Sequence, residues 1–132
     1  MLNLLLAEDN PGDVRLVREA IRESAIAVEL VIASDGAQAL SYLRRSQFDL
    51  AILDLNLPKH DGQAILQLCA MSPGAPPFVV FTSSSQQTDR ELALLVGAKD
   101  YVVKPTDLRE YIKAVHGILD RWHECHERIK QD

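Results

Sequence analysis

Four consecutive apolar residues, Leu50 to Leu53, lie between Asp49 and Asp54 and constrain the fold more than any other stretch. A strand with one face in water alternates polar and apolar residues, whereas a strand buried on both faces is apolar throughout. We therefore expect Asp49–Asp54 to be a central strand of a parallel sheet covered by helices. Such sheets bind ligands beyond the carboxyl ends of their strands, where Asp54 would lie. An aspartate there can also simply cap a turn.

Similar apolar runs occur at five places, and each is followed by a segment with helical spacing of apolar residues. The expected strands are Asn3–Ala7, Val28–Ala33, Asp49–Asp54, Pro77–Thr82 and Asp100–Val103. The expected helices begin near Asp13, Ala37, Ala64, Thr88 or Asp89, and Thr106 or Asp107; the third ends at Met71, and the last covers about 107–129. This alternation predicts a doubly wound, flavodoxin-like α/β fold, (βα)5, with a five-stranded parallel sheet. We choose the order 2-1-3-4-5, because polar residues gather after strands one and three, which are neighbours in it.

The composition fits one domain spanning residues 1–132. Hydrophobic residues make up 47% and charged residues 25%, which excludes a disordered chain. A net charge of -5 gives the domain no overall attraction for nucleic acid. Cys69 and Cys125 lie far apart and indicate neither a zinc site nor a disulfide framework. Because there is no basic leader and no apolar run near the roughly 18 residues of a membrane span, we expect a cytoplasmic protein without a membrane partner.

Polar side chains follow the expected strands at the edge where ligands of such sheets bind. They are Glu8 and Asp9, then Asp54 and Asn56, then Thr82 and Ser83, then Lys104. Three carboxylates within a few ångströms of one another would repel strongly unless a hard divalent cation neutralised them. Mg²⁺ takes few protein oxygens and keeps several waters, which leaves room for phosphate oxygens. The sequence therefore predicts a Mg²⁺ site.

One of these carboxylates could act as a nucleophile toward phosphorus. Asp54 is the best candidate, because its strand is central. Thr82 offers a hydroxyl to a phosphoryl oxygen, and Lys104 offers a compact positive charge. A lone lysine at position 104 would be interpreted as a surface residue, but together with three acidic strand ends it is better explained as part of a site.

Four motifs carry a resemblance to a known family. They are AEDN (Ala7–Asn10), LDLNLPKHDG (Leu53–Gly62), FTSSS (Phe81–Ser85) and GAKDYVVKP (Gly97–Pro105). Over nearly the whole chain they resemble the CheY-like receiver domain of two-component response regulators. The resemblance implies a phosphorelay protein that catalyses only its own aspartyl phosphorylation and dephosphorylation, with a sensor histidine kinase as partner.

By that resemblance, Asp54 is the phosphoacceptor and Mg²⁺ is the cofactor. Asp9 and Asp54 would bind the metal by their side chains, Asn56 by its backbone carbonyl, and Glu8 through water. No site residue departs from the family pattern.

The resemblance also implies a switch. Thr82 and Lys104 would contact the phosphoryl group, and the Lys104–Pro105 peptide would be cis. Tyr101 matches an aromatic side chain that moves inward when Thr82 is drawn toward the phosphoryl group.

The same residues also bear on alternative functions. A phosphatase of the haloacid-dehalogenase type needs a second aspartate two residues after the nucleophile, where Asn56 stands. A flavin carrier needs a glycine-rich phosphate loop after the first strand, which is not evident. A phosphorylation-independent scaffold or dimerisation module stays open, although the intact acidic set argues against it.

A narrower resemblance concerns EDNPGDVRLVREAI (Glu8–Ile21), LNLPKHDG and a long last helix with Trp122. These features are similar to small stand-alone regulators that pair with bacterial phytochrome histidine kinases. Many of those carry a longer segment before the third strand, which this chain lacks.

The last expected helix predicts a protein contact as the output, since no output domain follows it in this sequence. Leu108, Val115, Trp122 and Ile129 recur every seven residues, as in a coiled-coil seam. We hypothesise that Trp122, Cys125 and Ile129 pack on a partner, most simply a second copy in a dimer. The alternative is that this tail folds back on its own domain or frays. His123 and His126 lack further ligands and are interpreted as solvated.

Overall fold

The computed structural model describes residues 1–58, 61–70 and 72–131, without the side chains of residues 129–131. Its strands are β1 (Leu2–Ala7), β2 (Val28–Ala33), β3 (Leu50–Leu53), β4 (Phe78–Thr82) and β5 (Asp100–Val103). Its helices are α1 (Pro11–Glu23), α2 (Gly36–Arg45), α3 (Gly62–Ala70), α4 (Gln87–Leu95) and α5 (Leu108–Gln131). The expected helix end at Met71 lies outside the described residues.

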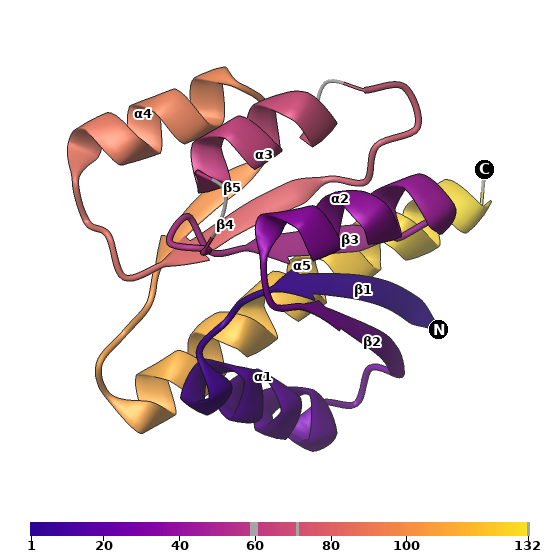
Figure 1. The fold of residues 1–132 in the computed structure, drawn as a ribbon. Helices are drawn as coiled ribbons and strands as arrows, with labels where there is room; N and C mark the ends of the chain where they lie inside the picture. Colours follow the sequence, from indigo (N-terminus) through magenta and orange to yellow (C-terminus); the bar gives the residue numbers. More distant parts are fainter. Residues whose placement is uncertain (59–60, 71, 132) are drawn as a thin grey trace.

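The strands form a single parallel sheet in the order β2-β1-β3-β4-β5. This confirms the expected fold class and strand order. Helices α1 and α5 cover one face of the sheet, and α2, α3 and α4 cover the other (Figure 1). Because all strands run the same way, their carboxyl ends meet at a single edge.

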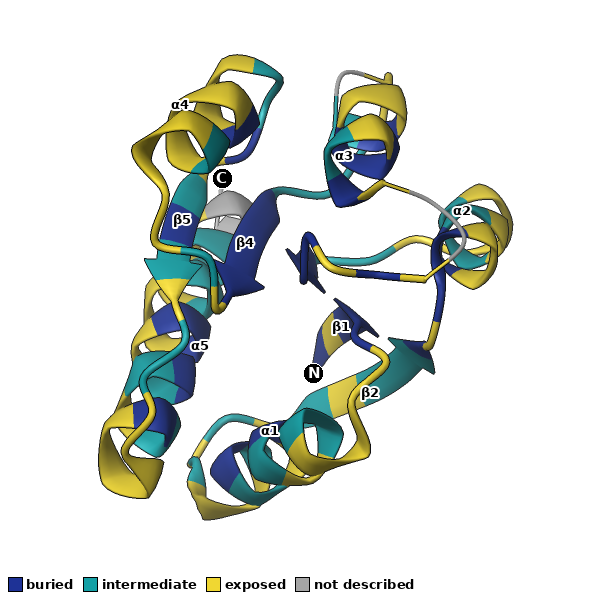
Figure 2. Ribbon diagram, turned by 60° about the vertical axis from the view of Figure 1, so that its left-hand side comes forward, coloured by how far each residue is buried: buried dark blue, intermediate teal, exposed yellow. Residues whose placement is uncertain are grey.

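Burial follows from this three-layer arrangement. All four residues of β3 are buried, as are all five of β4, while β2 at the edge is mostly half-buried (Figure 2). Alternate residues of the central strands face opposite layers: Leu5 and Leu53 pack with α2, α3 and α4, whereas Leu4 and Ile52 pack with α1 and α5. The buried inner strands of the sheet therefore include β1 and β3, and Glu8 and Asp54 directly follow them.

Candidate functional site

Backbone hydrogen bonds continue past the strand ends and bring distant residues to the same edge. The Asp54 N–H donates to the Ala7 carbonyl at 3.0 Å, so Asp54 lies beside the end of β1. The Lys104 N–H donates to the Thr82 carbonyl at 2.7 Å, so Lys104 lies beside the end of β4. These backbone hydrogen bonds between strands therefore place Asp54 and Lys104 at this edge. Glu8 lies there as well, because it directly follows Ala7.

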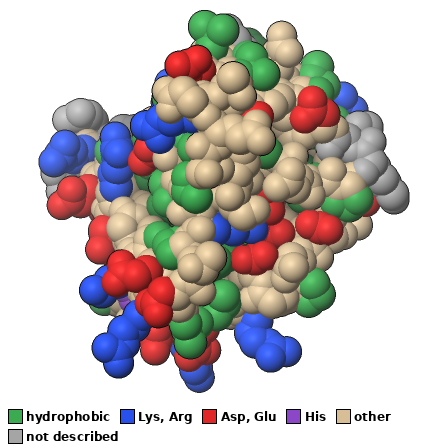
Figure 3. All heavy atoms as spheres, turned by 90° about the vertical axis from the view of Figure 1, so that its left-hand side faces the viewer, with side chains coloured by type: hydrophobic (Ala, Val, Ile, Leu, Met, Phe, Trp, Pro, Cys, Tyr) green, Lys and Arg blue, Asp and Glu red, His purple; other side chains and the backbone are tan. Residues whose placement is uncertain are grey.

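The Lys104 side chain crosses this edge and ends between two carboxylates. Its Nζ donates to Glu8 Oε1 at 2.5 Å and to Asp54 Oδ2 at 2.9 Å. Glu8 is 3% exposed and Asp54 is 6% exposed. Figure 3 looks onto this edge, where acidic and basic side chains lie together in the middle. The expected grouping of Glu8, Asp54 and Lys104 is therefore present, and the lysine supplies the neutralising charge that the sequence argument assigned to a divalent cation.

A third carboxylate belongs to the group and was not predicted. Asp13 Oδ2 lies 3.2 Å from Lys104 Nζ, and Asp13 Oδ1 accepts a hydrogen bond from the Tyr111 hydroxyl at 2.8 Å. The first helix was expected to begin near Asp13, but Asn10 caps α1 by accepting from the backbone N–H groups of residues 12 and 13. The signal was Pro11, because proline favours the first helical position and so makes the preceding residue the cap.

Burial and charge shift the ionisation of this group. Burial raises the pKa of the Glu8 carboxyl to about 7, although the Lys104 ammonium opposes the shift. Burial alone would lower the pKa of Lys104, but hydrogen bonds to Glu8 and Asp54 outweigh it, so that pKa lies above its ordinary value. Lys104 is therefore a fixed positive charge at neutral pH.

The remaining expected metal ligands lie at the rim of the edge. Asp9 is exposed, and no hydrogen bond or ion pair involves its carboxylate among the described residues. Asn56 is also exposed, and its backbone N–H donates to Asp54 Oδ1 at 3.1 Å. In the described part of the chain, no three His, Cys, Asp or Glu side chains already form a metal-binding group. The donors at hand are nevertheless all oxygens, which suit Mg²⁺ or Mn²⁺.

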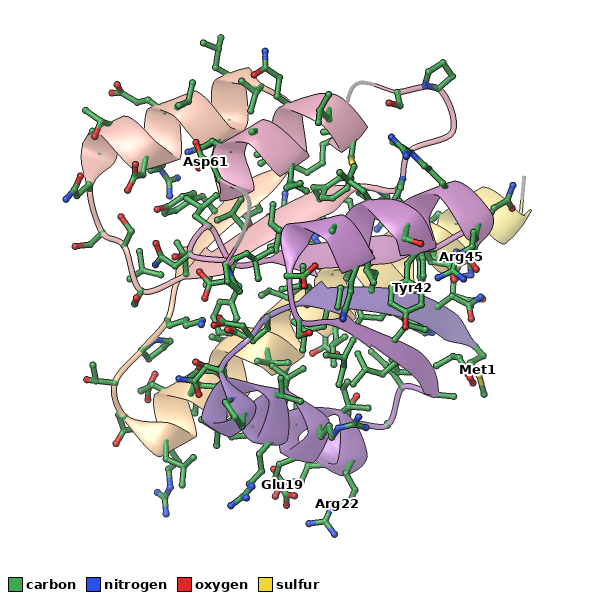
Figure 4. All side chains as sticks on the ribbon, viewed as in Figure 1. Met1, Glu19, Arg22, Tyr42, Arg45 and Asp61 are labelled. Atoms are coloured by element: carbon green, nitrogen blue, oxygen red, sulfur yellow. The ribbon has the colours of Figure 1, made fainter. Side chains whose placement is uncertain are left out.

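The loop after Asp54 is held by a close backbone approach. Asp61 accepts from the Gln63 N–H at 3.1 Å at the start of α3 (Figure 4), and the Gly62 N–H donates to the Leu55 carbonyl at 3.3 Å. A Cβ at Gly62 would lie 2.5 Å from the Leu55 Cα. Glycine is therefore required here, and it sets the path of the segment that carries Asn56.

The expected switch residues lie on the neighbouring strands β4 and β5, where Thr82 is the last residue of β4 and Tyr101 pairs with Val80. Thr82 is fully buried, and its hydroxyl oxygen is 3.5 Å from the Ser84 N–H. Tyr101 is 4% exposed, and its hydroxyl donates to the Ser84 carbonyl at 2.9 Å. The Arg90 guanidinium lies 5.9 Å from the centre of the Tyr101 ring and donates to the Tyr101 carbonyl. The aromatic side chain is thus already in the inward position.

The expected cis peptide is wrong: the Lys104–Pro105 bond is trans. The trans form of an X-Pro bond is intrinsically favoured by about 0.5–1 kcal/mol. Lys104 already reaches Glu8 and Asp54 with the trans bond, so nothing in the site compensates for the cis form.

The expected partner surface on α5 is partly used by the domain itself. Trp122 packs against the core beneath α1 and α5, and its indole N–H is buried without an acceptor among the described residues. His126, expected to be solvated, has Nδ1 3.4 Å from Asp49 Oδ1, so α5 still contacts the residue before β3 there. Cys125 is half-buried, and the Ile129 side chain lies outside the described residues.

Comparison with known proteins identifies the family. A family model described as the response regulator receiver domain matches residues 4–116. This chain belongs to the response regulator receiver family. The acidic edge described above therefore belongs to a receiver domain, and the resemblance drawn from the four motifs is confirmed.

Individual relatives agree with this placement. The receiver domain is 35% identical to response regulator Rcp1 of Synechocystis sp., over 92% of this chain and 88% of Rcp1. It is also 35% identical to the transcriptional regulatory protein BaeR of Escherichia coli, over 98% of this chain but 52% of BaeR. The chain thus spans about half the length of that transcriptional regulator.

Solved structures match the fold closely. The Mn²⁺-bound form of Rcp1 has a TM-score of 0.87 at 34% identity, covering 92% of this chain and 94% of that one. The phosphorylated cyanobacterial phytochrome response regulator RcpA has the same TM-score and identity, covering 92% of this chain and 93% of its own.

Within the described residues of the receiver, no helix is both long and apolar enough to span a lipid bilayer.

Proposed function

We propose that this receiver takes a phosphoryl group from a sensor histidine kinase onto Asp54, with Mg²⁺ as cofactor, and thereby switches its protein contacts. The observation that carries the proposal is the Lys104 ammonium, 2.9 Å from Asp54 Oδ2 in a buried site. A phosphoryl group arriving there would meet a nucleophilic carboxylate and a positive charge together. Phosphoryl transfer depends mainly on such positioning and electrostatics.

The transfer exchanges one bond for another. An Asp54 carboxylate oxygen forms a bond to phosphorus while the bond from phosphorus to the kinase histidine nitrogen breaks. The imidazole leaves with the electron pair and takes a proton from solvent. Lys104 offsets the charge that spreads over the phosphoryl oxygens, and Thr82 offers its hydroxyl to one of them.

Asp9, Asp54, the Asn56 backbone carbonyl and, through water, Glu8 would hold the metal. A bound Mg²⁺ would neutralise carboxylate charge and draw phosphoryl oxygens toward Asp54. The Mn²⁺-bound form of Rcp1, 34% identical, supports a divalent cation in this family, and the oxygen-only donor set of this chain supports Mg²⁺.

The proposed partner is a sensor histidine kinase of the phytochrome type. The similarity to Rcp1 and to the phytochrome response regulator RcpA supports this choice. We also propose that this protein works in the cytoplasm as a single receiver domain. The similarity to Rcp1, of which this chain covers 88%, supports this. We propose no contact with nucleic acid or with a membrane, because the chain has a net charge of -5.

The proposed output is dimerisation through the end of α5. Trp122, Cys125 and Ile129 would form the surface, and the side chains of Trp122 and Cys125 are only half-buried within the domain. Sedimentation of the phosphorylated and unphosphorylated protein tests this idea. A monomer in both forms, independent of concentration, would refute it.

A phosphorylation-independent scaffold is the second candidate, and the position of Tyr101 favours it. In the proposed switch this ring moves inward on phosphorylation, yet here it is already buried on the Ser84 carbonyl. Such a scaffold would hold its partner surface in one state whatever happens at Asp54.

Transfer from a kinase separates the two candidates. A phytochrome-type kinase is labelled on its histidine with radioactive ATP, freed of nucleotide, and mixed with wild type or Asp54→Asn in Mg²⁺. The proposal expects the label to move to wild type within minutes and not to the variant. If wild type binds the kinase but takes no label, the scaffold is the better account.

A further inference from the structure

Asp13 contacts the site without a role in the proposed chemistry. It lies in the first turn of α1, and because Asn10 caps the helix, its carboxylate is free to face the strand ends. Its two oxygens have different partners: Oδ2 lies 3.2 Å from Lys104 Nζ, and Oδ1 accepts from Tyr111 at 2.8 Å. A helix-capping or surface role explains neither contact.

Tyr111 is itself rigidly placed. It is a buried residue of α5, and its ring meets Phe81 edge to face, with centroids 5.1 Å apart and an interplanar angle of 67°. Phe81 immediately precedes Thr82 in β4. A hydrogen bond from such a fixed hydroxyl orients the Asp13 carboxylate toward Lys104.

Among the described residues, Lys104 has three partners from three different parts of the chain, and an ammonium has three hydrogens to share among them. They are Glu8 after β1, Asp13 in α1 and Asp54 after β3. In the proposed function, Asp54 becomes phosphorylated and Glu8 serves the metal through water. Asp13 is then the partner whose charge the chemistry leaves unchanged.

We propose that Asp13, oriented by Tyr111, is a positioning residue that keeps the Lys104 ammonium over Asp54 throughout phosphoryl transfer. The inference rests on the proposed function and extends it to a residue to which the receiver resemblance assigned no role. Without Asp13, the lysine would lose its permanent anchor, and the oxygens of the arriving phosphoryl group would meet a less well placed charge.

The test compares Asp13→Asn, Tyr111→Phe and, as a control, Glu19→Gln. Glu19 lies on the same helix and pairs with Arg22, away from the sheet (Figure 4). With Mg²⁺ and acetyl phosphate, Asp13→Asn should lower the maximal phosphorylation rate about three- to tenfold and leave the half-saturating acetyl phosphate concentration unchanged. Tyr111→Phe should act in the same direction but less strongly, and Glu19→Gln should match wild type.

A double-mutant cycle with Lys104→Met distinguishes positioning from a general structural effect. If Asp13 acts through Lys104, Asp13→Asn causes no further loss of rate in the Lys104→Met protein. An equal loss in both backgrounds, or no loss in wild type, would overturn the inference and leave the proposed function standing.

The same cycle is measured on urea unfolding midpoints of the metal-free proteins, which needs no phosphorylation. Non-additive midpoint shifts are expected for Asp13→Asn and Lys104→Met, and additive shifts would overturn the contact. A wild type that is never phosphorylated would overturn the proposed function, while this cycle would still decide whether Asp13 holds Lys104.

Discussion

Lys104 and Asp54 are 50 positions apart in the chain, yet the lysine ammonium lies 2.9 Å from the aspartate Oδ2 in a buried site. The contact joins the ends of β3 and β5, which are not neighbours in the sheet. Because the sheet fixes both ends, the charge of Lys104 is held in place before any phosphoryl group arrives. The stability of the metal-free protein and its chemistry should therefore depend on the same pair.

Lys104→Met should destabilise the metal-free protein by about 3–5 kcal/mol, because Glu8 and Asp54 would be left as buried carboxylates without a counter-charge. Urea unfolding in the presence of a chelator measures this. Lys113→Met is the matched control, since its ion pair with Glu110 is on the surface, and it should change stability by less than about 1 kcal/mol. Equal effects of the two substitutions would contradict the account.

The free energy of unfolding of the metal-free protein should fall as the pH rises from about 5 to 7, because of the shifted pKa of Glu8. Its carboxyl has a pKa of about 7 in the folded protein and an ordinary value of 4.5 when unfolded. Between these values the folded state holds a proton that the unfolded state has released, so the stabilising contribution is complete below pH 4.5 and lost above 7. The slope is at most about 1.4 kcal/mol per pH unit.

Glu8→Gln isolates this contribution. Its unfolding free energy, relative to wild type, should rise with pH over the same window, whereas the exposed-site control Glu91→Gln should show no such trend. A difference between Glu8→Gln and wild type that is independent of pH would mean that Glu8 is not the titrating group.

Gly62→Ala should destabilise the protein by about 1–3 kcal/mol, because its Cβ would meet Leu55 backbone atoms at 2.5 and 2.6 Å and the loop must move. The same movement should weaken Mg²⁺ binding, since Asn56 is on that loop. Thermal unfolding and a Mg²⁺ titration measure the two effects. The control is Gly117→Ala in α5, where a Cβ has nothing within 4 Å; it should stabilise by about 0.5–1 kcal/mol.

Tyr101→Phe should destabilise the protein by about 0.5–1.5 kcal/mol, because the Ser84 carbonyl loses its hydroxyl donor. Tyr42→Phe is the control, since the Tyr42 ring lies under the Arg45 guanidinium at the end of α2 (Figure 4), and no hydrogen bond of its hydroxyl is among those described. Chemical denaturation measures the free energy of unfolding of the two variants. If Tyr101→Phe is as stable as Tyr42→Phe, the inward position does not depend on that hydrogen bond.

The strands and their order could be predicted from the sequence because burial on both faces leaves a direct trace in residue type. Leu50–Leu53 is apolar throughout, and Phe78–Thr82 is apolar except for Thr82 at its end. All residues of both strands are buried. That Glu8, Asp54 and Lys104 lie at one edge of the sheet then follows from topology, since parallel strands end at a common edge.

Other features depend on contacts that leave no periodic trace. Asp13 joins the site because Asn10 takes over the helix cap, and Tyr111 reaches it from 98 positions away. The repulsion between carboxylates suggested a divalent cation, but the sequence could not show that the Lys104 side chain is long enough to end among them. The cis Lys104–Pro105 bond was implied only by the family resemblance, whereas the bond is trans, the form that an X-Pro pair intrinsically favours.

The most direct test of the central claim is the intact mass of the protein after incubation with acetyl phosphate and Mg²⁺, with Asp54→Asn and a chelated sample as controls. The account predicts one added phosphoryl group on wild type and none on either control. No added mass on wild type, together with failure to bind Mg²⁺ and beryllofluoride, would contradict it and leave a phosphorylation-independent scaffold as the function.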